Sequence, residues 1–173
     1  MTAAPATAVE DGMFTLKNIQ PILCQVQVSN LPEGSYVKSI RLGNQDVGEE
    51  GIDLSRGASD GLQVTISMAG AQVDGIVQSG ESKPVSVATV VLVPESRRYS
   101  LFREARTGED GGFSFNGVTP GDYKLLAWED IETGAYQDPE FLKKYESKAE
   151  SLSLKESGRR TLQVKVIPLE EQR

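Results

Sequence analysis

The sequence predicts an all-β protein built as an antiparallel Greek-key β-sandwich with one short helix. Short segments rich in Val, Ile, Leu, Phe and Tyr alternate with polar residues, and this period of two marks a strand with one buried face. Turn signals, namely SGESKP, TGEDGG, TPGD and ESGRR, separate these segments. Strands interrupted by turns every 8–12 residues or so are typical of two packed sheets.

Six strands are predicted in the C-terminal part of the chain. In the first, alternate positions from Val73 to Val77 are expected to face the core. The last shows the same period, with Leu162, Val164 and Val166 facing inward. The fifth has apolar residues on both sides, so we expect a central strand covered on both faces. The six predicted strands span residues 72–78, 85–94, 98–107, 112–118, 122–130 and 160–168.

One segment, residues 137–152, is predicted to form a helix of two or three turns. Asp138 is placed to cap it, and Pro139 suits its first position. Phe141 and Tyr145 are four residues apart and therefore share a face. We expect this helix, near residues 138–150, to lie across the mouth of the sandwich. There it either covers an edge strand or shapes a binding surface.

The chain repeats a block of its own sequence. EDGMFTLKNIQP, which starts at Glu10, aligns without a gap to EDGGFSFNGVTP, which starts at Glu109. LQVTI at 62–66 likewise matches LQVKV at 162–166. Blocks in the same order at a period of about 100 residues predict two related units. In both copies Asp-Gly supplies a tight turn, because Gly accepts positive φ and Asp can bond to the backbone ahead of it.

This repeat predicts three parts of the chain. Residues 1–9 are expected to be disordered, residues 10–69 to form a partial unit that lacks its first strands, and residues 70–173 to form a complete sandwich. Cys24 occupies the position of Tyr123 in the first copy. A Tyr at such a corner commonly anchors its hydroxyl to nearby backbone, which a Cys cannot reach.

A unit without its first strands suggests that the chain is the C-terminal portion of a longer array, cut within a domain. Its exposed edges would leave the first unit poorly ordered, docked on the second unit, or completed by strands of another chain.

Composition disfavours several function classes. The 173 residues are 38% hydrophobic and carry a net charge of −7, whereas nucleic-acid binding depends on clustered Lys and Arg. The longest apolar run, ATVVLV, is far shorter than the roughly 20 residues of a membrane span, and the first residues lack the pattern of a signal peptide.

Catalytic, cofactor and metal sites are all predicted to be absent. The chain has no histidine, which removes the commonest general base and zinc ligand, and its one cysteine can form no intrachain disulfide. Acidic clusters near turns could bind calcium, but without a D-x-D-x-D pattern they are better explained as solvated turn residues.

Residues 73–168 resemble the carboxypeptidase regulatory-like domain, a transthyretin-like (prealbumin-like) β-sandwich grouped with carbohydrate-binding-like folds. The resemblance lies in VDGIVQ, PVSVATVVLVP, the turn EDGGFSF and the corner PGDY. The longer sequence features of this segment resemble domains that occur in tandem arrays in surface or secreted proteins of acidobacteria. The resemblance implies a non-catalytic structural or interaction module of a larger exported or cell-surface bacterial protein, outside the cytoplasm. Its partners would be other domains of that protein. The transthyretin-related hydrolase of purine breakdown needs histidines, which this chain lacks.

The alternative function is a carbohydrate-binding accessory module, whose partner would be a sugar rather than another protein. Sugar sites on sandwiches typically combine exposed aromatic rings with polar side chains, and Tyr99 is a further ring of this kind. The competing interpretation is that Phe141 and Tyr145 cover Trp128 in a satellite core. The candidate ligand surface consists of Trp128, Glu129, Asp130, Tyr136, Gln137 and Tyr145.

Overall fold

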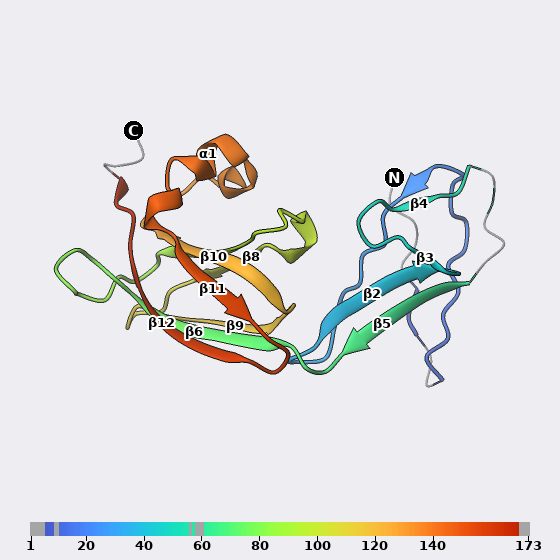
Figure 1. The fold of residues 1–173 in the computed structure, drawn as a ribbon, viewed down its shortest axis with the longest axis horizontal. Helices are drawn as coiled ribbons and strands as arrows, with labels where there is room; N and C mark the ends of the chain where they lie inside the picture. Colours follow the sequence, from blue (N-terminus) through green and yellow to red (C-terminus); the bar gives the residue numbers. More distant parts are fainter. Residues whose placement is uncertain (1–5, 9–10, 56, 58–60, 170–173) are drawn as a thin grey trace. The chain divides into compact units, whose positions relative to one another are not determined.

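A computed structural model describes residues 6–8, 11–55, 57 and 61–169 (Figure 1). Most of the predicted disordered segment 1–9 therefore lies outside the described residues. The strands are β1 (Leu23–Cys24), β2 (Tyr36–Leu42), β3 (Gln45–Asp46), β4 (Ile52–Asp53), β5 (Leu62–Ser67), β6 (Ala71–Gln78), β7 (Thr89–Pro94), β8 (Arg103–Arg106), β9 (Gly112–Val118), β10 (Gly121–Trp128), β11 (Glu150–Leu154) and β12 (Arg159–Lys165). The helical turns are η1 (Tyr99–Leu101), η2 (Ala135–Gln137), α1 (Pro139–Lys143) and η3 (Glu146–Lys148).

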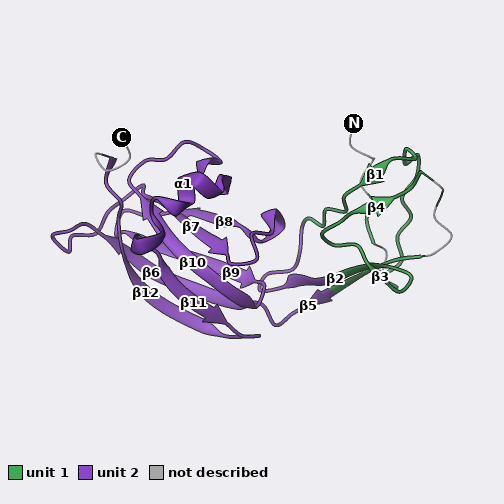
Figure 2. Ribbon diagram, turned by 45° about the horizontal axis from the view of Figure 1, so that its top comes forward, with its two compact units in different colours: residues 1–29, 39–65 green, residues 30–38, 66–173 purple. Residues whose placement is uncertain are grey.

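The chain divides into two compact units (Figure 2). Unit 1 consists of residues 1–29 and 39–65, and unit 2 consists of residues 30–38 and 66–173. Unit 1 holds the short β1–β4 ladder, in which Cys24 lies opposite Ile52. The division falls within β2 and β5, which are neighbours in the sheet β3-β2-β5.

Unit 2 contains two sheets that pack face to face. One has the strand order β11-β10-β7-β8 and the other the order β12-β6-β9. Consecutive strands change sheet at β6–β7, β8–β9, β9–β10 and β11–β12. Buried apolar side chains from both sheets form one core cluster. The predicted all-β fold with one short helix is therefore confirmed.

The predicted alternation appears in both outer segments of this unit. In β6, Val73 and Val77 are buried, whereas Ile76 on the other face is 40% exposed. In β12, Val164 is buried between exposed Gln163 and Lys165. One pair departs from the antiparallel pattern, because β12 runs parallel to β6. A parallel pair needs a long connection, and here the chain passes through β7 to β11 between β6 and β12.

The strand β10 is central and covered on both faces, as predicted. Its neighbours are β11 and β7. Tyr123, Leu125 and Ala127 enter the core between the sheets. Leu126 and Trp128 enter a second apolar cluster on the outer face of the four-stranded sheet. The segment from η2 to η3 contributes Tyr136, Leu142 and Tyr145 to that second cluster.

The helix begins as predicted and ends earlier. Asp138 Oδ1 accepts a hydrogen bond of 2.9 Å from the Glu140 N–H, and Pro139 occupies the first turn. The predicted helical segment extends to residue 152, but residues 150–154 form β11 instead. In this stretch Leu152 and Leu154 are buried and the serines are exposed. Pairing with the edge of β10 and burial of two leucines outweigh the helix propensity of the preceding residues.

The two copies of the repeated block share a turn and differ afterwards. Asp11 Oδ1 accepts from the Met13 N–H at 2.9 Å, and Asp110 Oδ1 accepts from the Gly112 N–H at the same distance. The second copy continues into β9, which pairs with β6, whereas residues 13–19 form no strand. A strand needs a partner, and β6 pairs with β9 of the second copy. The assignment of residues 10–69 as a partial unit of the same type stays a prediction.

Residues 30–38 belong to unit 2, where a close backbone contact and a polar clamp hold them. The Gly70 N–H donates to the Gly34 carbonyl at 2.9 Å. Gly117, with φ of 66°, lies so close that a Cβ there would be 2.5 Å from the Ser35 oxygen. Tyr36 Oη and Lys38 Nζ both donate to Glu156 Oε1, at 2.9 and 3.0 Å.

A buried threonine holds the start of β7. Thr107 Oγ1 donates to the Val85 carbonyl and accepts from the Ala88 N–H, each at 2.8 Å. Between them Val87 is 61% exposed and has φ of 60°, which is rare for a β-branched residue. Thr107 therefore fixes the turn that precedes β7.

Candidate functional site

The candidate ligand surface lies on the outer side of the four-stranded sheet, but its three aromatic residues are buried. Trp128 is 0% exposed, Tyr145 4% and Tyr136 8%. The polar members Glu129, Asp130 and Gln137 are exposed. The candidate surface therefore has two parts, a buried cluster of aromatic rings and a set of exposed polar side chains.

Trp128 is enclosed by the rings of the helical segment. Its ring centroid lies 5.8 Å from that of Tyr145, with the planes at 90°, and 6.1 Å from that of Phe141. These are the edge-to-face and tilted geometries that aromatic pairs prefer. The indole Nε1 is buried and has no hydrogen-bond partner among the described residues. Trp128 therefore acts as a packed core residue, which agrees with the satellite-core interpretation, and it offers no face to a ligand.

Tyr136 and Tyr145 are likewise held within the fold. Tyr136 Oη donates to Glu104 Oε2 at 2.8 Å, which links η2 to β8. Burial and this hydrogen bond raise the pKa of Tyr136 to about 12. Tyr145 packs on Phe141, with ring centroids 5.1 Å apart.

A lysine joins the helical segment to the sheet beneath it. Lys124 Nζ on β10 pairs with Glu146 of η3 and lies 3.6 Å from Glu95 Oε1. The hydrogen bond with Glu146 raises the pKa of Lys124, and the same bond lowers the pKa of Glu146. The charges therefore fasten η3 over β10.

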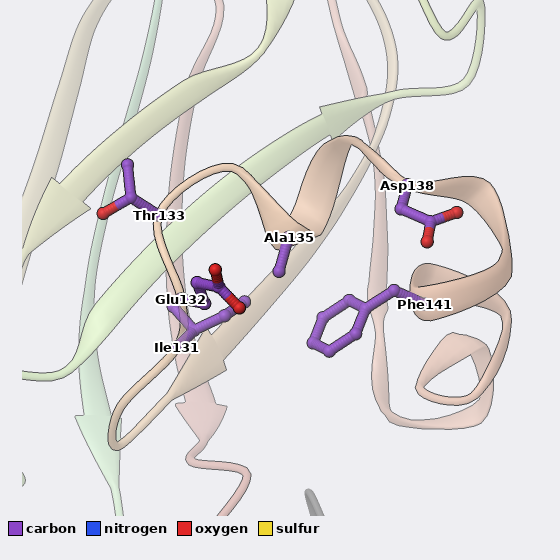
Figure 3. Close-up of a pocket in the computed structure, with 6 residues that line it drawn as sticks. All are labelled: Ile131, Glu132, Thr133, Ala135, Asp138 and Phe141. Carbon is purple, nitrogen blue, oxygen red and sulfur yellow. The ribbon is translucent and has the colours of Figure 1, made fainter.

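Asp130 and Gln137 directly precede, in sequence, two residues that line a shallow hollow, Ile131 and Asp138 (Figure 3). The Phe141 ring points toward Ile131 and Glu132, whereas Thr133 points away. Glu129 Oε2 accepts from the Leu169 N–H at 3.1 Å, so this carboxylate fixes the chain after β12. The hollow is lined by Ile131, Glu132, Thr133, Ala135, Asp138 and Phe141.

The structure shows a second group of stacked aromatic rings, and the candidate surface included only one of them, Tyr136. The group consists of Tyr99, Phe102 and Tyr136. Tyr99 stacks on Phe102 with centroids 6.2 Å apart and planes at 25°, and Phe102 stacks on Tyr136 at 6.1 Å and 29°. Tyr99 is 69% exposed. The sequence signal that could have indicated this group is the spacing of Tyr99 and Phe102 within an arginine-rich turn. Only the tertiary structure shows that Tyr136 continues the stack.

Within the described residues, no group of three or more Cys, Asp or Glu side chains is arranged to hold a metal ion. No described helix combines the length and the apolar character needed to cross a bilayer. Cys24 is half-buried, and its Sγ lies 3.5 Å from the Ile22 carbonyl oxygen.

No family model and no curated protein matches the chain. Several solved structures resemble part of it at low identity. BcpA, the major pilin subunit of Bacillus cereus, is 13% identical with a TM-score of 0.40, and the match covers 63% of this chain and 35% of BcpA. The group B streptococcus pilus 2b backbone protein is 15% identical with a TM-score of 0.38, over 83% and 53% of the two chains. A proposed carbohydrate-binding protein of Pseudomonas aeruginosa is 14% identical with a TM-score of 0.37, over 56% and 88%. The chain thus spans about a third to a half of the two pilus proteins' lengths. A similarity of this strength identifies neither a family nor a ligand.

Proposed function

We propose that unit 2 is a carboxypeptidase regulatory-like, transthyretin-like module that serves a non-catalytic structural or interaction role. It would belong to a larger exported or cell-surface bacterial protein, with residues 70–173 as a complete domain and residues 10–69 as a partial one. Its partners would be neighbouring domains of that protein.

The observation that carries this proposal is the corner at Tyr123. The hydroxyl donates to the Thr119 carbonyl at 2.7 Å, and the ring is 2% exposed. This anchored corner follows the Asp-Gly turn and the strand β9, in the order that the resemblance implies. Thr107 and Tyr136 also use their polar groups to join strands and loops. Such cross-links suit a rigid module.

Force spectroscopy on the full chain, placed between two reference domains, tests this role. The proposed complete domain, residues 70–173, should unfold in one event that releases roughly 34–37 nm of chain, less the end-to-end distance of the folded domain. Hydrogen exchange should show matching protection in β6, β7, β9 and β10. Stepwise lengthening at forces well below those of the reference domains would argue against a structural role.

A second candidate function, a carbohydrate-binding accessory module, is favoured by the exposed residues beside the hollow. Glu129, Asp130 and Gln137 are exposed acceptors and donors, and two of them adjoin in sequence the residues that line the hollow with the partly exposed Phe141 ring. A glycan array with the full chain tests it, with Asp130→Asn and Gln137→Ala as variants. Trp128→Ala is unsuitable, because it removes a ring from the core. Absence of binding at millimolar sugar would remove this candidate.

A further inference from the structure

We propose that Tyr99 and the arginines around it form a binding site for an acidic polysaccharide, one whose sugar units carry uronic carboxylates. The inference rests on the second candidate function and places its site on the turn between β7 and β8. It does not depend on the structural role of unit 2.

The platform of this site is a layered set of rings. Phe102 covers only one face of the Tyr99 ring, and 69% of Tyr99 remains exposed. Phe102 in turn rests on Tyr136, which is 8% exposed and bonded to Glu104. An exposed tyrosine supported in this way presents a flat apolar face, on which the C–H face of a pyranose ring can pack.

The turn is ordered before any ligand binds. Arg103 Nη1 donates to the carbonyls of Ser100 and Phe102, at 3.0 and 3.1 Å. The Arg97 N–H donates to the Pro94 carbonyl at 3.0 Å, and the Leu101 N–H donates to the Arg98 carbonyl at the same distance. Because these contacts fix the backbone, binding loses little conformational entropy here.

The charge of the turn identifies the class of sugar. Residues 97–106 carry four arginines and one glutamate, in a chain whose net charge is −7. Of these arginines, Arg97 and Arg106 are exposed, whereas Arg103 donates to backbone carbonyls and contributes only its charge. Guanidinium groups bind carboxylates in a bidentate geometry and are the preferred donors for them. The single glutamate, Glu104, already accepts the Tyr136 hydroxyl. This short segment therefore attracts a polyanion that the rest of the chain repels.

The geometry favours a polymer over a single sugar. Glu104 and Arg106 are two residues apart on β8, so they share a face of the strand. Glu104 binds the inner ring of the stack, which places exposed Arg106 on the same side as the rings, about 7 Å further along the strand. A chain with repeated carboxylates can stack on Tyr99 and reach Arg106 together.

Titration calorimetry with hexagalacturonate, and with an oligoalginate as a second uronic ligand, tests the proposal. We expect the full chain to bind both ligands and not cellohexaose. Tyr99→Ser should weaken binding at least tenfold, whereas Tyr99→Phe should keep it. Arg106→Ser should weaken binding and make it less sensitive to salt. Arg160→Ser, which removes an exposed charge from β12 in the other sheet, is the matched control and should change nothing.

Three results would overturn the proposal. The first is no binding of either uronic ligand at millimolar concentration, and the second is equal loss in Arg160→Ser and Arg106→Ser. The third is equally tight binding of single-stranded DNA or of an acidic peptide, which would mean unspecific attraction of polyanions. If another glycan binds and Tyr99→Ser has no effect, this site is wrong while the second candidate function survives. A thermal unfolding curve for each variant confirms that the exposed substitutions leave the fold intact.

Discussion

Replacing Tyr123 with Phe is predicted to destabilise unit 2 at neutral pH and to lose this effect at alkaline pH. The hydroxyl donates to the Thr119 carbonyl at 2.7 Å from a ring that is 2% exposed. Its removal leaves that carbonyl without its donor in a partly buried place, at a cost of about 1–2 kcal/mol. For a domain of about 100 residues this lowers Tm by roughly 5–15 °C.

The pH dependence follows from the burial of the same hydroxyl. Burial raises the pKa of Tyr123 from 10.0 to about 12. The unfolded chain ionises at the ordinary pKa, so the stability that the neutral hydroxyl provides is complete below pH 10 and is lost as pH rises toward 12. At pH 11 this loss amounts to about 1.4 kcal/mol. The difference between wild type and Tyr123→Phe should therefore vanish near pH 11 and reverse above it.

Urea unfolding at pH 7, 9, 10 and 11 measures this difference, with the fluorescence of the single, buried Trp128 as the signal. Tyr136 also titrates at high pH, but it does so in both proteins and cancels. Tyr99→Phe is the control and should stay within about 0.5 kcal/mol of wild type, because that ring is exposed. A constant difference from pH 7 to pH 11 would refute the raised pKa, and no difference at pH 7 would refute the anchored corner.

Three further substitutions test other contacts. Thr107→Val keeps the shape of the side chain but leaves a buried N–H and a carbonyl unpaired, so urea unfolding should show a loss of about 2–4 kcal/mol. Gly117→Ala places a Cβ 2.5 Å from a backbone oxygen at positive φ, so limited proteolysis should cut residues 30–38 faster. Gly80→Ala, where a Cβ meets nothing within 4 Å, should not change the cutting. The pKa of Glu156 is lowered by its bonds to Lys38 and Tyr36. Its contribution is present above the ordinary carboxyl pKa and falls away in acid, so Glu156→Gln should flatten the loss of stability between pH 6 and pH 3.

Local sequence was sufficient wherever the stabilising contact lies within a few residues. The Asp-Gly turns at Asp11 and Asp110, the cap at Asp138 and the alternation in β6 all appear as predicted. The central position of β10 also followed from its sequence, because a strand with apolar residues on both sides must be covered on both sides. The anchored corner at Tyr123 was also expected from the sequence, because a Tyr at such a corner commonly bonds to nearby backbone.

Contacts between distant residues decided the rest. The same Asp-Gly turn leads into β9 in one copy and into no strand in the other, because only the second copy has β6 beside it. Residues 150–154 form β11 instead of the predicted helix, because they pair with the edge of β10.

The burial of the aromatic residues of the candidate surface could not be predicted from the sequence, for the same reason. Sequence shows that Trp128 is large and near polar residues, but exposure depends on whether Phe141 and Tyr145 fold back over it. Conversely, the support beneath Tyr99 comes from Tyr136, which is distant in the chain. The sequence by itself determined the turns, the strand periods and the β-sandwich class, since these are local. The tertiary structure alone decided which rings are buried and which face solvent, since burial is a property of the whole packed chain.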